Sequence, residues 1–129
     1  GIYSLHLANS MPAVVKGAVT LSTPYGGAEV ADYAQYFLPF SRLMRDIGPS
    51  SWAMREAAKI KVQHPWCNVV TVQGRSPFIV VANDGVVSIQ SQRHHADMEL
   101  VDVDYNHYEV VLAEPVIEII RERINRIRK

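Results

Sequence analysis

The stretch Ala18–Gly27, AVTLSTPYGG, decides the predicted fold. Its first six residues are β-branched, aliphatic or small, and the run is too short for a helix. Apolar residues at both alternate and adjacent positions are typical of a strand that is buried on both faces. Pro24, Gly26 and Gly27 then end the run abruptly. We therefore predict a buried strand over residues 18–23.

Two further strands are predicted downstream. Residues 67–74 are rich in Val and end in a glycine, and residues 98–103 alternate apolar and polar side chains, which indicates one more solvated face. Helical spacing predicts a helix over residues 1–10 and another that starts at Pro115. This order predicts an α/β fold in three layers, α/β/α, with a parallel sheet of about three strands. The last helix carries a predicted apolar stripe of Ile117, Ile120, Ile124 and Ile127.

Residues 28–62 lie between the first two predicted strands and have an irregular helical pattern. Two proline-containing stretches interrupt this pattern. Ser41, and either Ser50 or Ser51, are placed to cap short helices. Several short helices with aromatic side chains, inserted between two strands, are typical of a lid, and an enlarged crossover is the alternative. We predict one domain over residues 1–129, with 28–62 as a helical lid-like insertion.

Groups that can carry chemistry follow the predicted strands. In a parallel α/β sheet, functional sites form at the carboxyl ends of the strands. The turn at Asn83-Asp84-Gly85 stops an apolar run, so it can hold the carboxylate of Asp84 out of the core. His107 lies in the loop after the third strand, 107 − 84 = 23 residues further along the chain. An acid and an imidazole brought together by a fold are two of the three groups of a Ser-His-Asp site.

Composition argues against several other functions. Thirteen basic and thirteen acidic residues give a formal net charge of zero, whereas a nucleic-acid surface needs a basic excess. No apolar run approaches the roughly 18 to 20 residues of a membrane span. Cys67 is the single cysteine, which excludes an intrachain disulfide and leaves the compartment undetermined. His94 and His95 are adjacent, and on an extended chain they point to opposite faces, which is poor geometry for one metal ion.

Three stretches and the last helix together carry a resemblance to α/β-hydrolases of the lipase and esterase type. Val15–Gly27 resembles the sixth strand of that family and its T-P-[HY]-x-G loop. Asn83–Ser88 resembles the acid turn after the seventh strand, and Asn106-His107-Tyr108 resembles the loop of the catalytic histidine. The last helix is similar to the terminal helix that packs on the family's sheet. The resemblance covers essentially the whole chain.

The resemblance implies roles for individual residues. Asp84 would be the acid and His107 the base of a serine hydrolase that acts on a carboxylic ester, such as an ester of a lipid or of another acyl substrate. Tyr25, Tyr33 and Phe37 would belong to the substrate-binding or lid region. We expect no cofactor and no metal ion.

The resemblance also implies that the nucleophile is missing. The family carries it in a G-x-S-x-G elbow between a strand and a helix, and this sequence has no such motif. Gly1-Ile2-Tyr3 reads like the residues directly behind an elbow. We therefore expect the C-terminal portion of a hydrolase, inactive alone. The strand that would pair with residues 18–23 would be missing too, so we expect this edge to pair with a second copy or with the missing N-terminal half.

Other interpretations stay open at this point. Asp102 and Asp104 are competing acids for His107. Asp84 can be an ordinary residue of an Asn-Asp-Gly turn, and His107 an ordinary loop histidine. The whole chain can also be a non-catalytic domain that binds or assembles with a partner.

Overall fold

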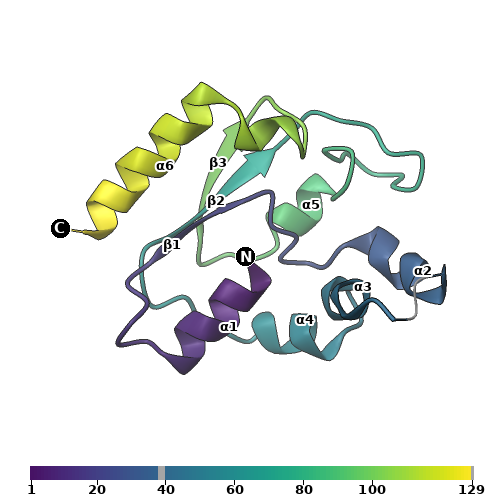
Figure 1. The fold of residues 1–129 in the computed structure, drawn as a ribbon, viewed down its shortest axis with the longest axis horizontal. Coiled ribbons are helices and arrows are strands. Elements are labelled where there is room, and N and C mark those ends of the chain that lie inside the picture. The colour runs from purple at the N-terminus through teal and green to yellow at the C-terminus, as the bar shows by residue number, and fades with distance from the viewer. Residues whose placement is uncertain (38–39, 129) are drawn as a thin grey trace.

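The structure, a computed structural model, describes residues 1–37 and 40–128, and this part of the chain holds a parallel sheet of three strands (Figure 1). β1 (Ala18–Leu21), β2 (Trp66–Thr71) and β3 (Glu99–Val103) are ordered β1-β2-β3, so β2 is central. Both neighbouring pairs are parallel. The predicted α/β class and the strand count are therefore confirmed.

The burial of the strands follows their place in the sheet. All residues of β2 are buried, because β2 has a neighbour on each side, as its Val-rich sequence predicts. In β3, Glu99 and Asp102 are exposed and Val103 is buried. Glu99 and Asp102 are three positions apart and therefore point to opposite faces of the sheet, so the prediction of one more solvated face is wrong.

Helix α1 (Ile2–Ser10) packs against α4 (Trp52–Ala57) in a first apolar cluster. The cluster also includes residues from the sheet and from the loops that lead into it. Tyr3, Leu7 and Met11, by contrast, are exposed on or just after α1. The buried members of the cluster are Ile2, Leu5, Tyr25, Met54, Ala57, Trp66 and Met98.

Helix α6 (Glu114–Ile127) and the short 3-10 helix η1 (Glu109–Val111) belong to a second apolar cluster. Its buried residues come from β2, β3, η1 and α6, and Pro115 lies in the first turn of α6 as predicted. The buried members are Val69, Val103, Val110 and Val116.

The face of α6 that meets the sheet differs from the predicted stripe. Ile120 is partly buried against the second cluster, but Ile117 and Ile124 are 44% and 43% exposed. Val116, one position before Ile117, is buried instead, and Ile119 is partly buried beside Ile120. When a helix carries apolar residues on two adjacent rows, the sequence does not show which of these residues will be buried, and packing against the sheet decides it.

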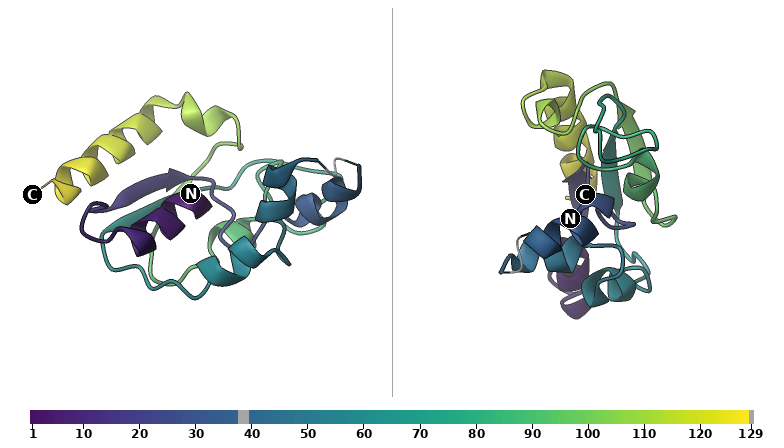
Figure 2. Two further views of the ribbon diagram at one scale, coloured as in Figure 1. Left: turned by 60° about the horizontal axis from the view of Figure 1, so that its bottom comes forward. Right: turned by 90° about the vertical axis from the view of Figure 1, so that its right-hand side faces the viewer.

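Three short helices form the connection between β1 and β2. α2 (Glu29–Phe37) and α3 (Arg42–Ile47) precede α4, and Figure 2 shows α2 and α3 beyond the sheet, away from the C-terminal end of α6. Ser41 and Ser51 cap α3 and α4 by accepting from amides three residues later, at 3.4 Å and 3.1 Å, as predicted. The predicted break falls partly on residues 38 and 39, which lie outside the described part. A lid role for this segment stays a prediction.

Two features of the fold bear on partners. In the described part of the chain, β1 pairs with β2 alone. The amides of Ala18 and Ser22 donate to β2 and its flanking residue, so the intervening amides of Val19 and Leu21 point to the free edge. None of the helices in residues 1–37 and 40–128 is long and apolar enough to cross a membrane.

Candidate active site

Asp84 is placed by a tight turn in the loop that follows β2. Its amide donates to the carbonyl of Val87 at 3.1 Å, and Asn83 pairs with Ser88 in an antiparallel bridge. Gly85 has a φ of +100°, which a glycine adopts without steric cost. Asp84 itself is fully buried, whereas the turn chemistry led us to expect its carboxylate outside the core. The carboxylate is buried among polar groups, which is why the burial is tolerated.

Both oxygens of the Asp84 carboxylate are surrounded by hydrogen-bond donors. An ionised carboxylate only accepts hydrogen bonds, so every polar neighbour must present a hydrogen to it. Oδ1 accepts from two backbone amides of the turn, at 3.0 Å and 2.8 Å. Oδ2 has three side-chain neighbours, at 2.5 Å, 3.0 Å and 2.8 Å. The five donors are the amides of Val86 and Val87, the hydroxyl of Thr71, the amide of Gln92 and Nδ1 of His107.

These neighbours decide the charge of Asp84. Burial raises the pKa of the Asp84 carboxyl, because it removes water from the charged form. The hydrogen bonds from His107, from Thr71 and from the turn amides lower the pKa, and together they outweigh burial. The pKa of Asp84 therefore lies below its ordinary value of 3.8, and the group is an anion at neutral pH.

His107 is placed by the loop after β3. The side-chain carbonyl of Asn106 accepts from the amides of Tyr108 and Glu109, both at 2.9 Å, which caps the start of η1. The amide of His107 donates to the carbonyl of Asp84 at 3.1 Å. The imidazole is held to the acid turn by both its side chain and its backbone, and its side chain is 28% exposed.

This contact selects one tautomer of His107. Because the Asp84 carboxylate can only accept, the hydrogen of the neutral imidazole lies on Nδ1. Nε2 then carries the free electron pair and can take a proton from a neighbouring nucleophile. The carboxylate also stabilises the imidazolium that forms when Nε2 is protonated. The pair thus has the geometry of a general base and its orienting acid.

The competing acids do not reach His107. Asp102 pairs with Arg93 on the surface, and Asp104 is exposed. Of the three candidate acids Asp84, Asp102 and Asp104, Asp84 is the one bonded to the imidazole in the structure. The 23-residue separation of the pair is bridged by the adjacent carboxyl ends of β2 and β3.

The three residues expected in the substrate or lid region lie in different settings. Tyr25 is 2% exposed, and its hydroxyl is bonded to Thr20 at 3.0 Å and to the indole nitrogen of Trp66 at 2.8 Å. This core position gives no support to a substrate contact at Tyr25. Phe37 is 86% exposed at the end of α2. The side chain of Tyr33 lies outside what the structure describes.

No nucleophile completes the pair within the described residues. None of their hydroxyl or thiol groups is hydrogen-bonded to the imidazole of His107. Ser22 has a left-handed φ of +48° directly after β1, but it is 2% exposed, and its hydroxyl lies 2.8 Å from that of Thr71. Its hydroxyl is therefore engaged in the core.

The start of α1 lies at the carboxyl ends of the strands, as does the pair of Asp84 and His107. A side chain built at Gly1 would overlap the side chain of Thr23, so the backbone at Gly1 packs directly on the loop after β1. That loop follows the carboxyl end of β1, and Asp84 and His107 meet at the carboxyl ends of the two neighbouring strands.

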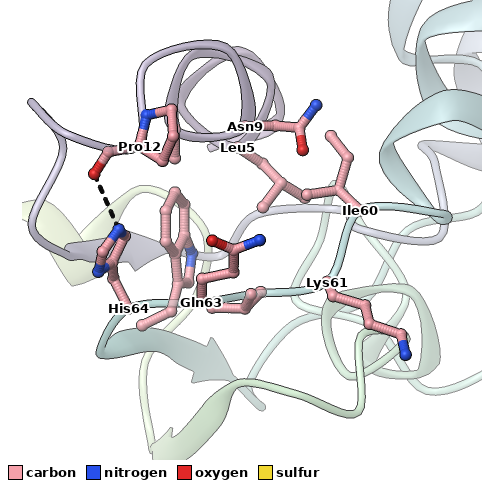
Figure 3. Close-up of a pocket in the computed structure, with 10 residues that line it drawn as sticks. Leu5, Asn9, Pro12, Ile60, Lys61, Gln63 and His64 are labelled. Atoms are coloured by element: carbon pink, nitrogen blue, oxygen red, sulfur yellow. Dashed lines mark hydrogen bonds between the residues drawn. The ribbon is translucent and has the colours of Figure 1, made fainter.

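A small cavity lies beside the segment that leads into the amino end of β2 (Figure 3). It is lined by α1 and by the segment that leads into Trp66, the first residue of β2, and its volume is about 40 Å³. This holds one or two water molecules, so the cavity is too small for a substrate. In the described part of the chain, no three His, Cys, Asp or Glu side chains gather as a metal site would require.

Two polar residues of the site were not predicted from the sequence. Thr71 and Gln92 are both fully buried and both contact Asp84. Thr71 reads as an ordinary strand residue, and Gln92 lies in α5 (Ile89–Gln92), a single turn capped by Ser88. Gln is seldom fully buried, so a buried Gln points to a specific hydrogen-bonding role, but the sequence alone does not show that Gln92 is buried.

Comparison of the chain with protein-family models, with curated proteins and with solved structures gives no match.

Proposed function

We propose that this chain carries the acid and base of a serine hydrolase site, with Asp84 as the acid and His107 as the base. The observation that carries the proposal is the 2.8 Å contact between the buried Oδ2 of Asp84 and Nδ1 of His107. The order of strand, acid turn, strand and histidine loop agrees with the resemblance to lipases and esterases.

The nucleophile in this proposal is a serine from a segment ahead of Gly1. Such a segment would end where α1 begins, at the carboxyl ends of the strands, where the acid and base meet. The free edge of β1 would receive the strand that leads to the elbow. The complete protein would then have three layers, with α1 on one face of the enlarged sheet and α6 on the other.

The substrate class that fits best is a carboxylic ester with an apolar acyl group. Apolar side chains are exposed on both loops that carry the pair. Phe78 and Val80 precede the acid turn and are 77% and essentially fully exposed, and Tyr108 and Leu112 follow His107 at 72% and 81%. Exposed apolar groups around a polar site favour an acyl or lipid substrate over a charged one.

A longer form of the protein with residues ahead of Gly1 and an elbow serine is expected to hydrolyse a short-chain p-nitrophenyl ester. The substitution His107→Gln will lower kcat by about 1,000-fold or more, because it removes the general base. A serine-directed phosphonate will stop turnover of the wild-type form. Release of p-nitrophenolate, followed by absorbance, measures all three effects.

The substitution His94→Gln is the matched control, since His94 is an exposed histidine outside the pair, and it should leave kcat within twofold. The proposal is wrong if the longer form has an intact elbow serine and is inert. It is also wrong if the 129-residue chain turns over the ester by itself in a phosphonate-sensitive way.

A non-catalytic assembly domain is the second candidate. It is favoured by the lack of a nucleophile beside His107 in the described residues and by the free edge of β1. A strand edge with unpaired amides and apolar side chains pairs readily with another strand. The zero net charge of the chain offers no repulsion between copies.

The edge of β1 is therefore expected to bind a strand from a second copy or from the remaining half of a hydrolase. Light scattering after size-exclusion chromatography will show a concentration-dependent mass above that of one chain. Val19→Pro removes an amide that faces the free edge and should shift the chain toward monomer. Val19→Ala keeps that amide and is the control for the lost side chain. A monodisperse wild-type monomer at all concentrations contradicts the prediction.

A further inference from the structure

A continuous line of buried polar side chains leads to the acid. The hydroxyl of Ser22 lies 2.8 Å from that of Thr71, and the hydroxyl of Thr71 lies 2.5 Å from Oδ2 of Asp84. Gln92 lies beside Thr71 and Asp84, with its amide nitrogen 3.0 Å from Oδ2 of Asp84. Thr71, Asp84 and Gln92 are all 0% exposed, and Ser22 is 2% exposed. The line therefore lies in the interior of the protein.

The hydrogen bonds of this line have one direction. Oδ2 of Asp84 only accepts, so the Thr71 hydroxyl donates its single hydrogen to it, and Ser22 donates to Thr71. Gln92 is fixed in the same way, because its side-chain carbonyl accepts from the amide of Thr71 at 2.9 Å. Its amide nitrogen is thereby turned toward Asp84. The side-chain carbonyl of Gln92 also lies 3.2 Å from the Thr71 hydroxyl, but the single hydrogen of that hydroxyl goes to the closer Oδ2 of Asp84.

We propose that Thr71 and Gln92 are positioning residues, which hold Oδ2 of Asp84 in line with Nδ1 of His107. In the described part of the chain, they are the side chains besides His107 that donate to Oδ2, so their hydrogen bonds oppose its rotation away from the imidazole. The turn amides of Val86 and Val87 hold only Oδ1. A catalytic effect of the two residues rests on the proposed hydrolase function, whereas their effect on the geometry of the pair does not.

The surroundings of Asp84 make this proposal measurable. His107 is the titratable side chain bonded to Asp84 in the described part, while β2 and α5 contribute the uncharged Thr71 and Gln92. Arg93, directly after α5, pairs with Asp102 of β3 on the surface, and the carboxylate of Glu29 in α2 is bonded to the hydroxyl of Ser88 rather than to Asp84. The titration of Asp84 therefore reports on these few bonds.

The first test compares Thr71→Val with Thr71→Ser in the 129-residue chain. Val has the shape of Thr without its hydroxyl, and Ser keeps the hydroxyl. Carbon-13 NMR of the carboxyl group, assigned by the loss of one signal in Asp84→Asn, measures the pKa of Asp84. Thr71→Val is expected to raise this pKa by about 1 to 2 pH units, the value of one hydrogen bond to a charged group. Thr71→Ser should restore the wild-type pKa.

The second test uses Gln92→Glu, which keeps the acceptor for the amide of Thr71. The introduced carboxyl lies beside Asp84, and two buried carboxyl groups at this distance share one proton. While it holds that proton it donates to Asp84 as the amide does. As the pH rises it ionises and repels Asp84, so the downfield proton signal of His107 Nδ1 should disappear. In the wild type this signal should persist over the same pH range.

The outcomes separate the two proposals. If Thr71→Val leaves the pKa of Asp84 unchanged, or if the Nδ1 signal in Gln92→Glu has the wild-type pH dependence, Thr71 and Gln92 are not positioning residues. Should Thr71→Val fail to fold, the Gln92→Glu titration decides the matter alone. Lack of ester turnover in the longer form, with both NMR results as expected, overturns the hydrolase function and leaves the positioning role intact.

Discussion

The substitution Asp84→Asn is expected to lower the free energy of unfolding by about 3 kcal/mol or more at pH 7. An Asn side chain has one oxygen where Asp has two, and its amide group is a donor. Asp84 accepts from donors on both oxygens, so either orientation of the Asn places donor against donor in a fully buried site. No rotation of the side chain relieves this conflict, which is why the expected loss is large.

The loss depends on pH in a defined direction. The pKa of Asp84 in the folded protein lies below 3.8, its ordinary value and the one expected in the unfolded chain. The stability that the carboxylate contributes is therefore fully present above about pH 3.8, and it is lost as the pH falls through the folded pKa. The difference in free energy of unfolding between the wild type and Asp84→Asn should become smaller as the pH falls below about 3.8.

Urea denaturation followed by circular dichroism, at pH 7 and at pH 3, measures both effects. Asp104→Asn is the control, because Asp104 is an exposed carboxylate three residues before His107. It should change the free energy of unfolding by less than about 0.5 kcal/mol. Equal losses in the two variants at pH 7 would show that Asp84 is not held as the structure has it.

The substitution Gly74→Ala is expected to have the second large effect, a loss of about 3 kcal/mol. Gly74 has a φ of +149°, and a Cβ built there would overlap the backbone of Asp84 and Gly85. The acid turn would have to move, at a cost of about 1–3 kcal/mol for crowding, with about 1–2 kcal/mol more for the unfavourable φ. The displacement should also remove the Nδ1 proton signal of His107.

Gly85→Ala is a matched control in the same turn. Gly85 has a φ of +100°, but a Cβ built there meets nothing within 4 Å. Only the conformational cost of about 1–2 kcal/mol is then expected, with the His107 signal retained. Thermal and urea unfolding of the two variants measure this difference. Equal destabilisation by both would mean that Gly74 does not pack on the acid turn.

The sequence predicts the parts of this structure that depend on local patterns. A Val-rich run such as the one in β2 is typical of a central strand, and Ser41 and Ser51 cap helices by local contacts. The contact between Asp84 and His107 could be predicted because both residues follow strands, and parallel strands bring their carboxyl ends together.

The remaining features depend on contacts between distant segments. Nothing near Gln92 in the sequence signals that it reaches Asp84 and Thr71, because α5 is a single turn. Tyr25 follows a strand as a substrate residue could, but packing against Thr20 and Trp66 places it in the core. The packed face of α6 includes Val116 and Ile119 beside the predicted Ile120 for the same reason, since packing on the sheet decides which apolar residues of the helix are buried.

The packing of Gly74 on Asp84 closes the base of the loop formed by residues 75–83. The outer part of this loop, including Phe78, Val80 and Val81, is exposed, so its side chains support little of the core. Loops whose ends are fixed together tolerate changes of length and sequence at small cost. The exposed positions Phe78, Val80 and Val81 are therefore expected to tolerate substitution while Asp84 and His107 stay in contact, whereas Ile79 is buried and belongs to the core. Under the proposed hydrolase function, new substrate specificity would be selected at these exposed positions without moving Asp84 and His107.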